Sequence, residues 1–166
     1  MDELELEGSP AVALTAAGHA RLQAELERLT VEKRQEIAER IRASKDHGEY
    51  SEDNNELDEV KIEQAIVETR IAELKSILSE ATILTPEDIP TDHVGIGSKV
   101  TLEDKTTGVK FDVQLVASVE ANADEDLISE ESPLGQAIAG LSQGETAKFE
   151  APAGPLTYTI AKIAKP

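Results

Sequence analysis

Seven carboxylates and no lysine or arginine lie between residues 46 and 59. Carboxylate oxygens suit hard cations, and Mg²⁺ is typically bound by one or two carboxylates together with substrate phosphates and waters. The spacing does not match an EF-hand loop, because the ligand alternation is incomplete and the central glycine is absent. Two interpretations stay open: a solvated acidic turn, or an incomplete cation site that a partner completes. The seven acids are Asp46, Glu49, Glu52, Asp53, Glu56, Asp58 and Glu59.

Other chemistry-bearing residues are sparse. His47 could act as a base or a ligand, but a lone histidine beside a turn is more often a cap or a surface group. The absence of cysteine excludes disulfides, thiolate metal sites and cysteine catalysis. The sequence contains no glycine-rich phosphate loop and no Gly-x-Ser-x-Gly motif.

The acidic run interrupts a long stretch with helical periodicity. No proline occurs between Thr15 and Glu80, and Gly48 with the following Ser/Asp/Asn cluster can end one helix and cap another. We therefore expect an antiparallel hairpin of two helices, each about 45 Å long at 1.5 Å per residue, with the acids at its tip. A single 65-residue helix is the alternative.

Apolar stripes support the hairpin. The first helix shows a leucine stripe with a slip near Lys33, and Gln64 is expected to set the register in the second. The stripe of the second helix steps by three and four residues, as in a coiled-coil seam: Leu57, Val60, Gln64, Val67, Ile71, Leu74 and Leu78.

The second half of the chain has β-rich runs separated by turn signals, and a short helix that Pro133 would start and Gly140 would follow. The expected fold is α+β: a coiled-coil hairpin followed by a small antiparallel sheet domain with one short helix. The expected divisions are a disordered acidic tail at 1–12, the hairpin at 13–80, a linker at 81–96 and the sheet domain at 97–166.

The overall charge restricts the partners. Thirty-four acidic residues against sixteen Lys and Arg give a formal charge of −18, which opposes direct binding of nucleic acid. Aromatic residues are too few for base-stacking platforms. No apolar run approaches the roughly 20 residues of a membrane span. The acidic N-terminus is unlike a secretory signal, so a cytoplasmic protein is expected.

Four segments stand out in order along the chain, and none of them is diagnostic alone. One is His47-Gly48, whose glycine lies thirty residues after Gly18. The other three segments are Leu14-Thr15-x-x-Gly18-x-x-x-Leu22-x-x-Glu25-Leu26-x-x-Leu29, Glu63-Gln64-Ala65-x-Val67-Glu68-x-Arg70-Ile71-x-x-Leu74, and Ile128-Ser129-x-x-Ser132-Pro133-Leu134-Gly135-x-Ala137-Ile138-x-Gly140. In this order and at this spacing the four segments resemble the Gre family, the transcript-cleavage factors of bacterial RNA polymerase.

The resemblance implies an FKBP-like C-terminal domain that docks on the rim of the polymerase secondary channel. The coiled coil would enter the channel and bring its acidic tip to the catalytic centre. There its carboxylates would help to hold a second Mg²⁺, shared with the polymerase, while backtracked RNA is hydrolysed near its 3′ end. The factor would not be an enzyme by itself. We expect it to be a monomer when polymerase is absent.

The tip differs from the family motif Gly-Asp-Leu-Ser-Glu-Asn by one added residue. Alignment from Gly48 places the functional acids at Glu49 and Glu52, whereas alignment backwards from Gln64 places the second acid at Asp53. Glu49, Glu52 and Asp53 are therefore the expected metal-binding and cleavage-promoting residues. Glu49 in place of Asp adds a methylene, which moves its carboxylate by about an ångström and weakens a geometry-sensitive site.

The C-terminal signature gives the expected partner-binding residues. By match to the family's rim-binding loop these are Ser129, Glu131 and Pro133, although Pro133 could simply start a helix and Ser129 could cap a turn. Two alternatives stay open: a Gre-like channel binder that does not promote cleavage or that inhibits polymerase, and a coiled-coil module unrelated to transcription.

Overall fold

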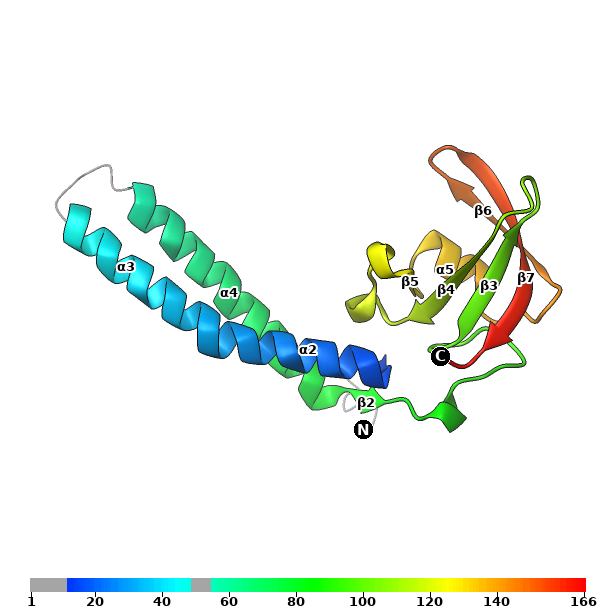
Figure 1. The fold of residues 1–166 in the computed structure, drawn as a ribbon, viewed down its shortest axis with the longest axis horizontal. Coiled ribbons are helices and arrows are strands. Elements are labelled where there is room, and N and C mark those ends of the chain that lie inside the picture. Colours follow the sequence, from blue (N-terminus) through cyan, green and yellow to red (C-terminus); the bar gives the residue numbers. More distant parts are fainter. Residues whose placement is uncertain (1–11, 49–54) are drawn as a thin grey trace, which may run out of the picture. The chain divides into compact units, whose positions relative to one another are not determined.

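The computed structural model describes residues 12–48 and 55–166, which form two compact units (Figure 1). One unit is His19–Glu80, and the other combines Ala81–Pro166 with the N-terminal residues up to Gly18. Each unit is considered separately below. The expected tail at 1–12 lies outside the described residues except for Val12, which is half-buried.

The first unit is a helical hairpin. Helix α2 (Ala16–Arg28) continues through a π-helical turn, η1 (Leu29–Lys33), into α3 (Arg34–Gly48), and α4 (Asn55–Glu80) returns alongside. Ion pairs join Glu25 to Arg70 and Arg40 to Glu63. Arg40 comes after Glu25 on the first helix, whereas its partner Glu63 comes before Arg70 on α4. The two helices are therefore antiparallel. The expected hairpin is confirmed over the single long helix.

The hairpin seam is apolar and has one irregularity. Leu22, Leu29, Ile37 and Ser44 are buried along the first helix at intervals of seven, eight and seven residues. The π turn lies within the eight-residue interval and absorbs the extra residue, so the slip expected near Lys33 is confirmed. On α4 the buried residues are Val60, Val67, Ile71 and Leu74.

The expectation for Gln64 is wrong, because Gln64 is exposed. The half-buried neighbour Glu63 takes the polar position instead, with its carboxylate 2.9 Å from Lys33 Nζ and 2.8 Å from Arg40 Nη1. The hydrogen bond from Lys33 has the largest effect in lowering the pKa of Glu63, and the hydrogen bond from Arg40 adds to it. The irregular turn brings Lys33 within reach of α4, and a regular heptad pattern cannot anticipate that geometry.

The second unit is built on a five-stranded sheet of order β5-β4-β3-β7-β6. All neighbours are antiparallel except β5, which runs parallel to β4, so the purely antiparallel sheet expected from the sequence needs this correction. Two short 3-10 helices, η3 (Ser118–Glu120) and η4 (Ala123–Glu125), lie between β4 and β5 and allow the parallel return. The strands are β3 (Lys99–Asp104), β4 (Lys110–Val116), β5 (Leu127–Ser129), β6 (Thr146–Ala151) and β7 (Gly154–Ala164).

One face of the sheet is closed by the short helix α5 (Pro133–Ile138), which confirms the single helix expected in this domain. Alternate strand residues Val100 and Leu102, with Ile160, are fully buried, and Ile138 of α5 joins them in one apolar core. This alternation is the two-residue period of a strand with one buried face. The α+β class is confirmed.

A two-stranded parallel ladder had no sequence signal. Strand β1 (Ala13–Leu14) pairs with β2 (Thr82–Ile83), through hydrogen bonds that join Thr82 N to Val12 O and Leu84 N to Leu14 O, each of 2.8 Å. The 81–96 segment also contains the 3-10 helix η2 (Pro86–Asp88) and buries Val94.

No helix in the described part of the chain is long and apolar enough to cross a membrane.

Candidate functional site

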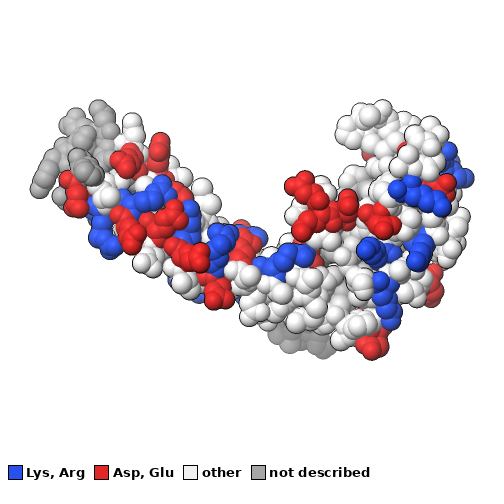
Figure 2. All heavy atoms as spheres, viewed as in Figure 1, with Lys and Arg blue, Asp and Glu red and all other residues white. Residues whose placement is uncertain are grey.

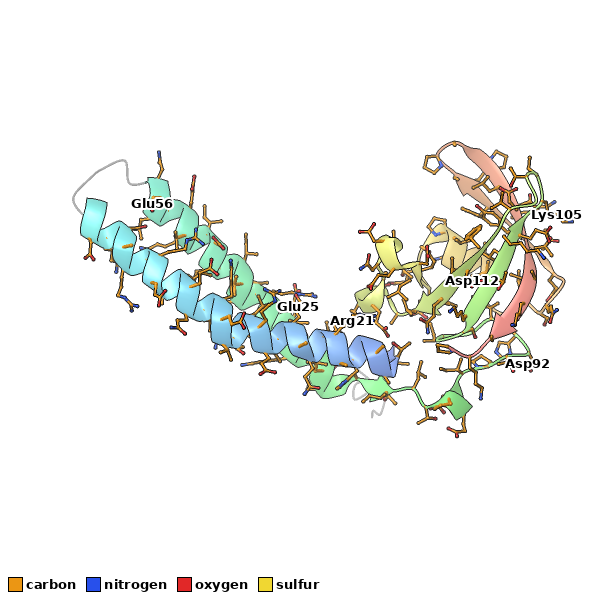
Figure 3. All side chains as sticks on the ribbon, in the orientation of Figure 1. Arg21, Glu25, Glu56, Asp92, Lys105 and Asp112 are labelled. Atoms are coloured by element: carbon orange, nitrogen blue, oxygen red, sulfur yellow. The ribbon has the colours of Figure 1, made fainter. Side chains whose placement is uncertain are left out.

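The acidic tip lies where the two long helices end. Glu49, Glu52 and Asp53, the expected metal-binding residues, lie outside the described residues, between the end of α3 at Gly48 and the start of α4 at Asn55. The acids on either side are described and are all exposed: Asp46, Glu56, Asp58 and Glu59. Glu56, labelled in Figure 3, is in the first turn of α4, where a helix N-terminus favours negative charge.

The described acids do not make a metal site of their own. Among residues 12–48 and 55–166, no three His, Asp or Glu side chains are grouped so as to hold a metal ion. Exposed carboxylates nevertheless have the oxygen chemistry that Mg²⁺ requires, and Mg²⁺ commonly keeps waters and takes phosphate oxygens as its other ligands.

The shaft of the hairpin differs electrostatically from its tip. Acidic and basic side chains are interspersed along the shaft in Figure 2, and several of them pair across the two helices. Arg34 donates two hydrogen bonds of 2.8 Å to Glu68, and Arg70 donates to Glu25 at 2.9 and 3.0 Å. These hydrogen bonds lower the pKa of both glutamates. The acidic surplus of the hairpin is therefore concentrated toward the tip.

The expected docking residues lie together in the sheet unit. Ser129 ends β5, Glu131 follows it, and the exposed Pro133 opens α5. Ser118 of η3 joins two of them, because its hydroxyl lies 2.7 Å from Ser129 Oγ and also donates to the Glu131 carboxylate. The backbone N–H of Glu131 donates to Ser129 Oγ at 3.0 Å. Side-chain hydrogen bonds thus join this loop to η3.

The same loop explains why a glycine follows Pro133 by two residues. Ser132 caps α5 by accepting a hydrogen bond of 3.0 Å from Gly135 N, and its hydroxyl donates to Ser129 O at 2.7 Å. A Cβ at Gly135 would lie 2.0 Å from Ser129 O, so no larger residue fits. Pro133 at the first helical position and Ser132 at the cap are the ordinary start of a helix.

Comparison with known proteins assigns both halves of the chain. Residues 12–83 match the family model described as transcription elongation factor, N-terminal, and residues 89–165 match the model transcription elongation factor, GreA/GreB, C-term. The chain belongs to the GreA/GreB family. Its relatives include the transcription elongation factor GreA of Syntrophomonas wolfei, 43% identical over 154 residues that cover 93% of this chain and 96% of that protein. GreA of Caldanaerobacter subterraneus is 42% identical over 155 residues, covering 93% and 98%.

Solved structures of related factors cover the same span. The GreA factor homolog 1 protein of Thermus thermophilus is 35% identical, with 92% of this chain and 98% of that chain covered and a TM-score of 0.42. The GreA/GreB factor from Nitrosomonas europaea is 20% identical, with a TM-score of 0.42.

This Gre-family chain has a groove beside the 129–133 loop that the sequence did not reveal. Its volume is about 420 Å³, and it lies within the sheet unit, with apolar walls and two carboxylates at its margin. Its lining comes from segments far apart in the chain, which no local pattern brings together. The lining residues are Val12, Ala13, Ile96, Ala117, Ser118, Val119, Glu130 and Glu131.

Proposed function

We propose that this protein stimulates the Mg²⁺-dependent cleavage of backtracked RNA that bacterial RNA polymerase carries out in its own active centre. The hairpin would enter the secondary channel, and the sheet unit would dock on the channel rim through Ser129, Glu131 and Pro133. The observation that supports the proposal is the exposure of the described acids of the run where α3 ends and α4 begins, in a charge-paired hairpin: Asp46, Glu56, Asp58 and Glu59. Helix α4 has 26 residues and is about 39 Å long at 1.5 Å per residue, so the two-helix hairpin is long and thin enough to enter a narrow channel.

The chemistry would be shared between the two proteins. Glu49 and either Glu52 or Asp53 would complete the coordination of a second Mg²⁺ beside the ion that the polymerase holds. When bound, the pair of ions activates a water and stabilises charge on the phosphoryl group. The factor contributes ligands and position, the polymerase supplies the active centre, and the setting is the cytoplasm.

The test is a purified polymerase complex stalled in a backtracked state with Mg²⁺. Addition of the protein should release short 3′ RNA fragments faster than the polymerase does alone, and Glu52→Ala combined with Asp53→Ala should abolish the gain. A matched control, Glu32→Ala with Glu39→Ala, removes two exposed acids from the shaft and should keep most of the activity. If the wild-type protein gives no gain, the proposal fails.

A channel-binding regulator without cleavage activity is the second candidate. The added residue between Gly48 and the start of α4 favours it, because it alters the spacing of the tip acids. This candidate requires slower nucleotide addition at saturating protein together with no released fragments. Released fragments would eliminate it.

A further inference from the structure

A half-buried glutamate of α4 is held by two cations of the facing helix. One carboxylate oxygen of Glu63 lies 2.9 Å from Lys33 Nζ, and the other lies 2.8 Å from Arg40 Nη1. The hydrogen bond with Glu63 raises the pKa of Lys33, so the pair is charged at neutral pH. Glu63, Lys33 and Arg40 are called the register clamp below.

The register clamp fills a gap in the apolar seam of the hairpin. Residues 61–66 of α4 lie between the buried Val60 and Val67, and among these six only Glu63 is half-buried while the others are exposed. On the first helix, the two cations of the clamp lie four residues before and three residues after Ile37, which is 2% exposed. A charged contact therefore occupies a stretch of the seam where the periodicity would place an apolar one.

The apolar residues alone leave the axial register of the hairpin ambiguous. Val67, Ile71 and Leu74 are buried at steps of four and three residues, so a slide of α4 by one helical turn exchanges one apolar contact for another. A carboxylate does not tolerate this exchange, because it loses its cations while remaining partly removed from water. A polar residue in the seam of a coiled coil specifies register in this way, at a cost in stability.

The register decides how the acids on the two sides of the tip face each other. Asp46 lies near the end of α3, whereas Glu56 and Asp58 lie in the first turn of α4. A slide of one helical turn would displace the acids of one helix along those of the other by about 5 Å. Ligand oxygens lie about 2 Å from Mg²⁺, and a displacement of about 1 Å at reacting groups can cost a hundredfold in rate.

We propose that Glu63 is a positioning residue, which uses Lys33 and Arg40 to set the axial register of α4 on the first helix and thereby the relative positions of the acids at the tip. The proposal rests on the function proposed above. Glu63 acts through its two cations and contacts neither RNA nor metal. All three residues of the clamp belong to the hairpin unit.

The first experiment measures the register directly. The chain has no cysteine, so two spin labels can be attached at Ala43→Cys on α3 and Ser76→Cys on α4, which are both exposed and lie toward opposite ends of the hairpin. A slide of one turn changes the distance between these labels by about 5 Å. Glu63→Leu, which replaces the charged contact with an apolar one, should add a second population of distances displaced by about that amount.

Glu68→Leu is the matched control for this substitution. Glu68 also pairs across the hairpin, with Arg34 at 2.8 Å, but both side chains are nearly half exposed and lie outside the seam. Exposed pairs of this kind contribute little. Glu68→Leu should therefore keep the single distance of the wild-type protein.

The two cations provide an independent variant. Lys33→Met combined with Arg40→Met removes both partners of Glu63 and should reproduce the displaced population. Adding these two substitutions to Glu63→Leu should cause no further displacement, because all three act through one network. Lys33→Arg, which keeps the cation, should keep the wild-type distance.

The second experiment separates register from stability. Replacement of a partly buried ion network by apolar side chains is often neutral or stabilising, so Glu63→Leu should keep or raise the melting temperature. On stalled polymerase it should nevertheless lower the cleavage rate at saturating factor by about tenfold or more. The factor concentration that gives half the maximal rate should change less than about threefold, because the sheet unit is unaltered. A residue that only stabilised the hairpin would give a lower melting temperature and, below it, a wild-type cleavage rate.

The two measurements also fail separately. A single wild-type distance in both Glu63→Leu and the Lys33→Met, Arg40→Met variant would overturn the proposal, as would an equal displacement in Glu68→Leu. A wild-type cleavage rate in Glu63→Leu despite a displaced distance would show that the register does not position the tip. If the wild-type protein fails to stimulate cleavage, the proposed function fails, but the distances still decide whether Glu63 sets the register.

Discussion

Gly135 belongs to the C-terminal sequence motif and also allows the backbone of Ser129 to approach closely. Because a Cβ there would lie 2.0 Å from Ser129 O, Gly135→Ala must displace the start of α5 or the end of β5. We expect a loss of about 1–3 kcal/mol in the free energy of unfolding, the usual cost of overpacking. Chemical denaturation would measure it. Gln136→Ala, an exposed neighbour, is the control and should change stability by less than about 0.5 kcal/mol.

The ion pair of Arg70 with Glu25 gives the hairpin a pH dependence. The hydrogen bonds from Arg70 lower the pKa of Glu25 below its ordinary value of 4.5. A lowered folded-state pKa contributes stability that is present above the unfolded-state value and is lost as pH falls through the folded-state value. At neutral pH we expect Arg70→Gln to cost about 0.5–1 kcal/mol. The difference in free energy of unfolding between the wild-type protein and Arg70→Gln should narrow below about pH 4.5.

Thermal unfolding of both proteins at several pH values measures this gap. Arg42→Gln, on the exposed surface of α3, is the control for loss of one positive charge. A gap that stays constant down to pH 2 would contradict the assignment of the effect to Glu25.

The π turn η1 accommodates one extra residue in the apolar seam of the first helix. Leu29 and Ile37 are eight residues apart, whereas the flanking buried pairs are seven apart. Deletion of the exposed Val31 should convert the π turn to regular α-helix and keep the seam, with a change of less than about 1 kcal/mol in stability. Deletion of the exposed Glu39 should rotate the rest of α3 by about 100° and remove Ser44 from the seam.

Circular dichroism and thermal unfolding distinguish the two deletions. The Glu39 deletion should lower the free energy of unfolding more than the Val31 deletion does, because it turns the buried Ser44 and the half-buried Ile41 away from the seam. Equal losses for both deletions would show that the π turn is not a removable insertion.

The elements differ in how far the sequence predicts them. The hairpin, its stripe and the slip near Lys33 follow from a local period of 3.6 residues, which short windows of residues 16–80 display. The β1–β2 ladder and the contact of Thr15 with Glu120 join residues 69 and 105 positions apart, and two-residue strands show no period. The three-and-four spacing predicts Gln64 in the seam, but the π turn of the facing helix brings Lys33 to Glu63, and Gln64 is exposed. The tip acids are read from residue types, and their geometry depends on residues outside the described part.

At the scale of the whole molecule, the net charge of −18 and the acidic tip predict a dependence on Mg²⁺. If the tip supplies ligands for a shared ion, the factor should lower the Mg²⁺ concentration needed for half-maximal RNA cleavage by stalled polymerase. Glu52→Gln with Asp53→Asn should raise that concentration by about tenfold relative to the wild-type factor, as loss of groups that support a metal typically does. Glu32→Gln with Glu39→Gln removes the same two charges from the shaft and should leave it unchanged. A requirement equal to that of polymerase alone, at full factor occupancy, would show that the acids do not bind the ion.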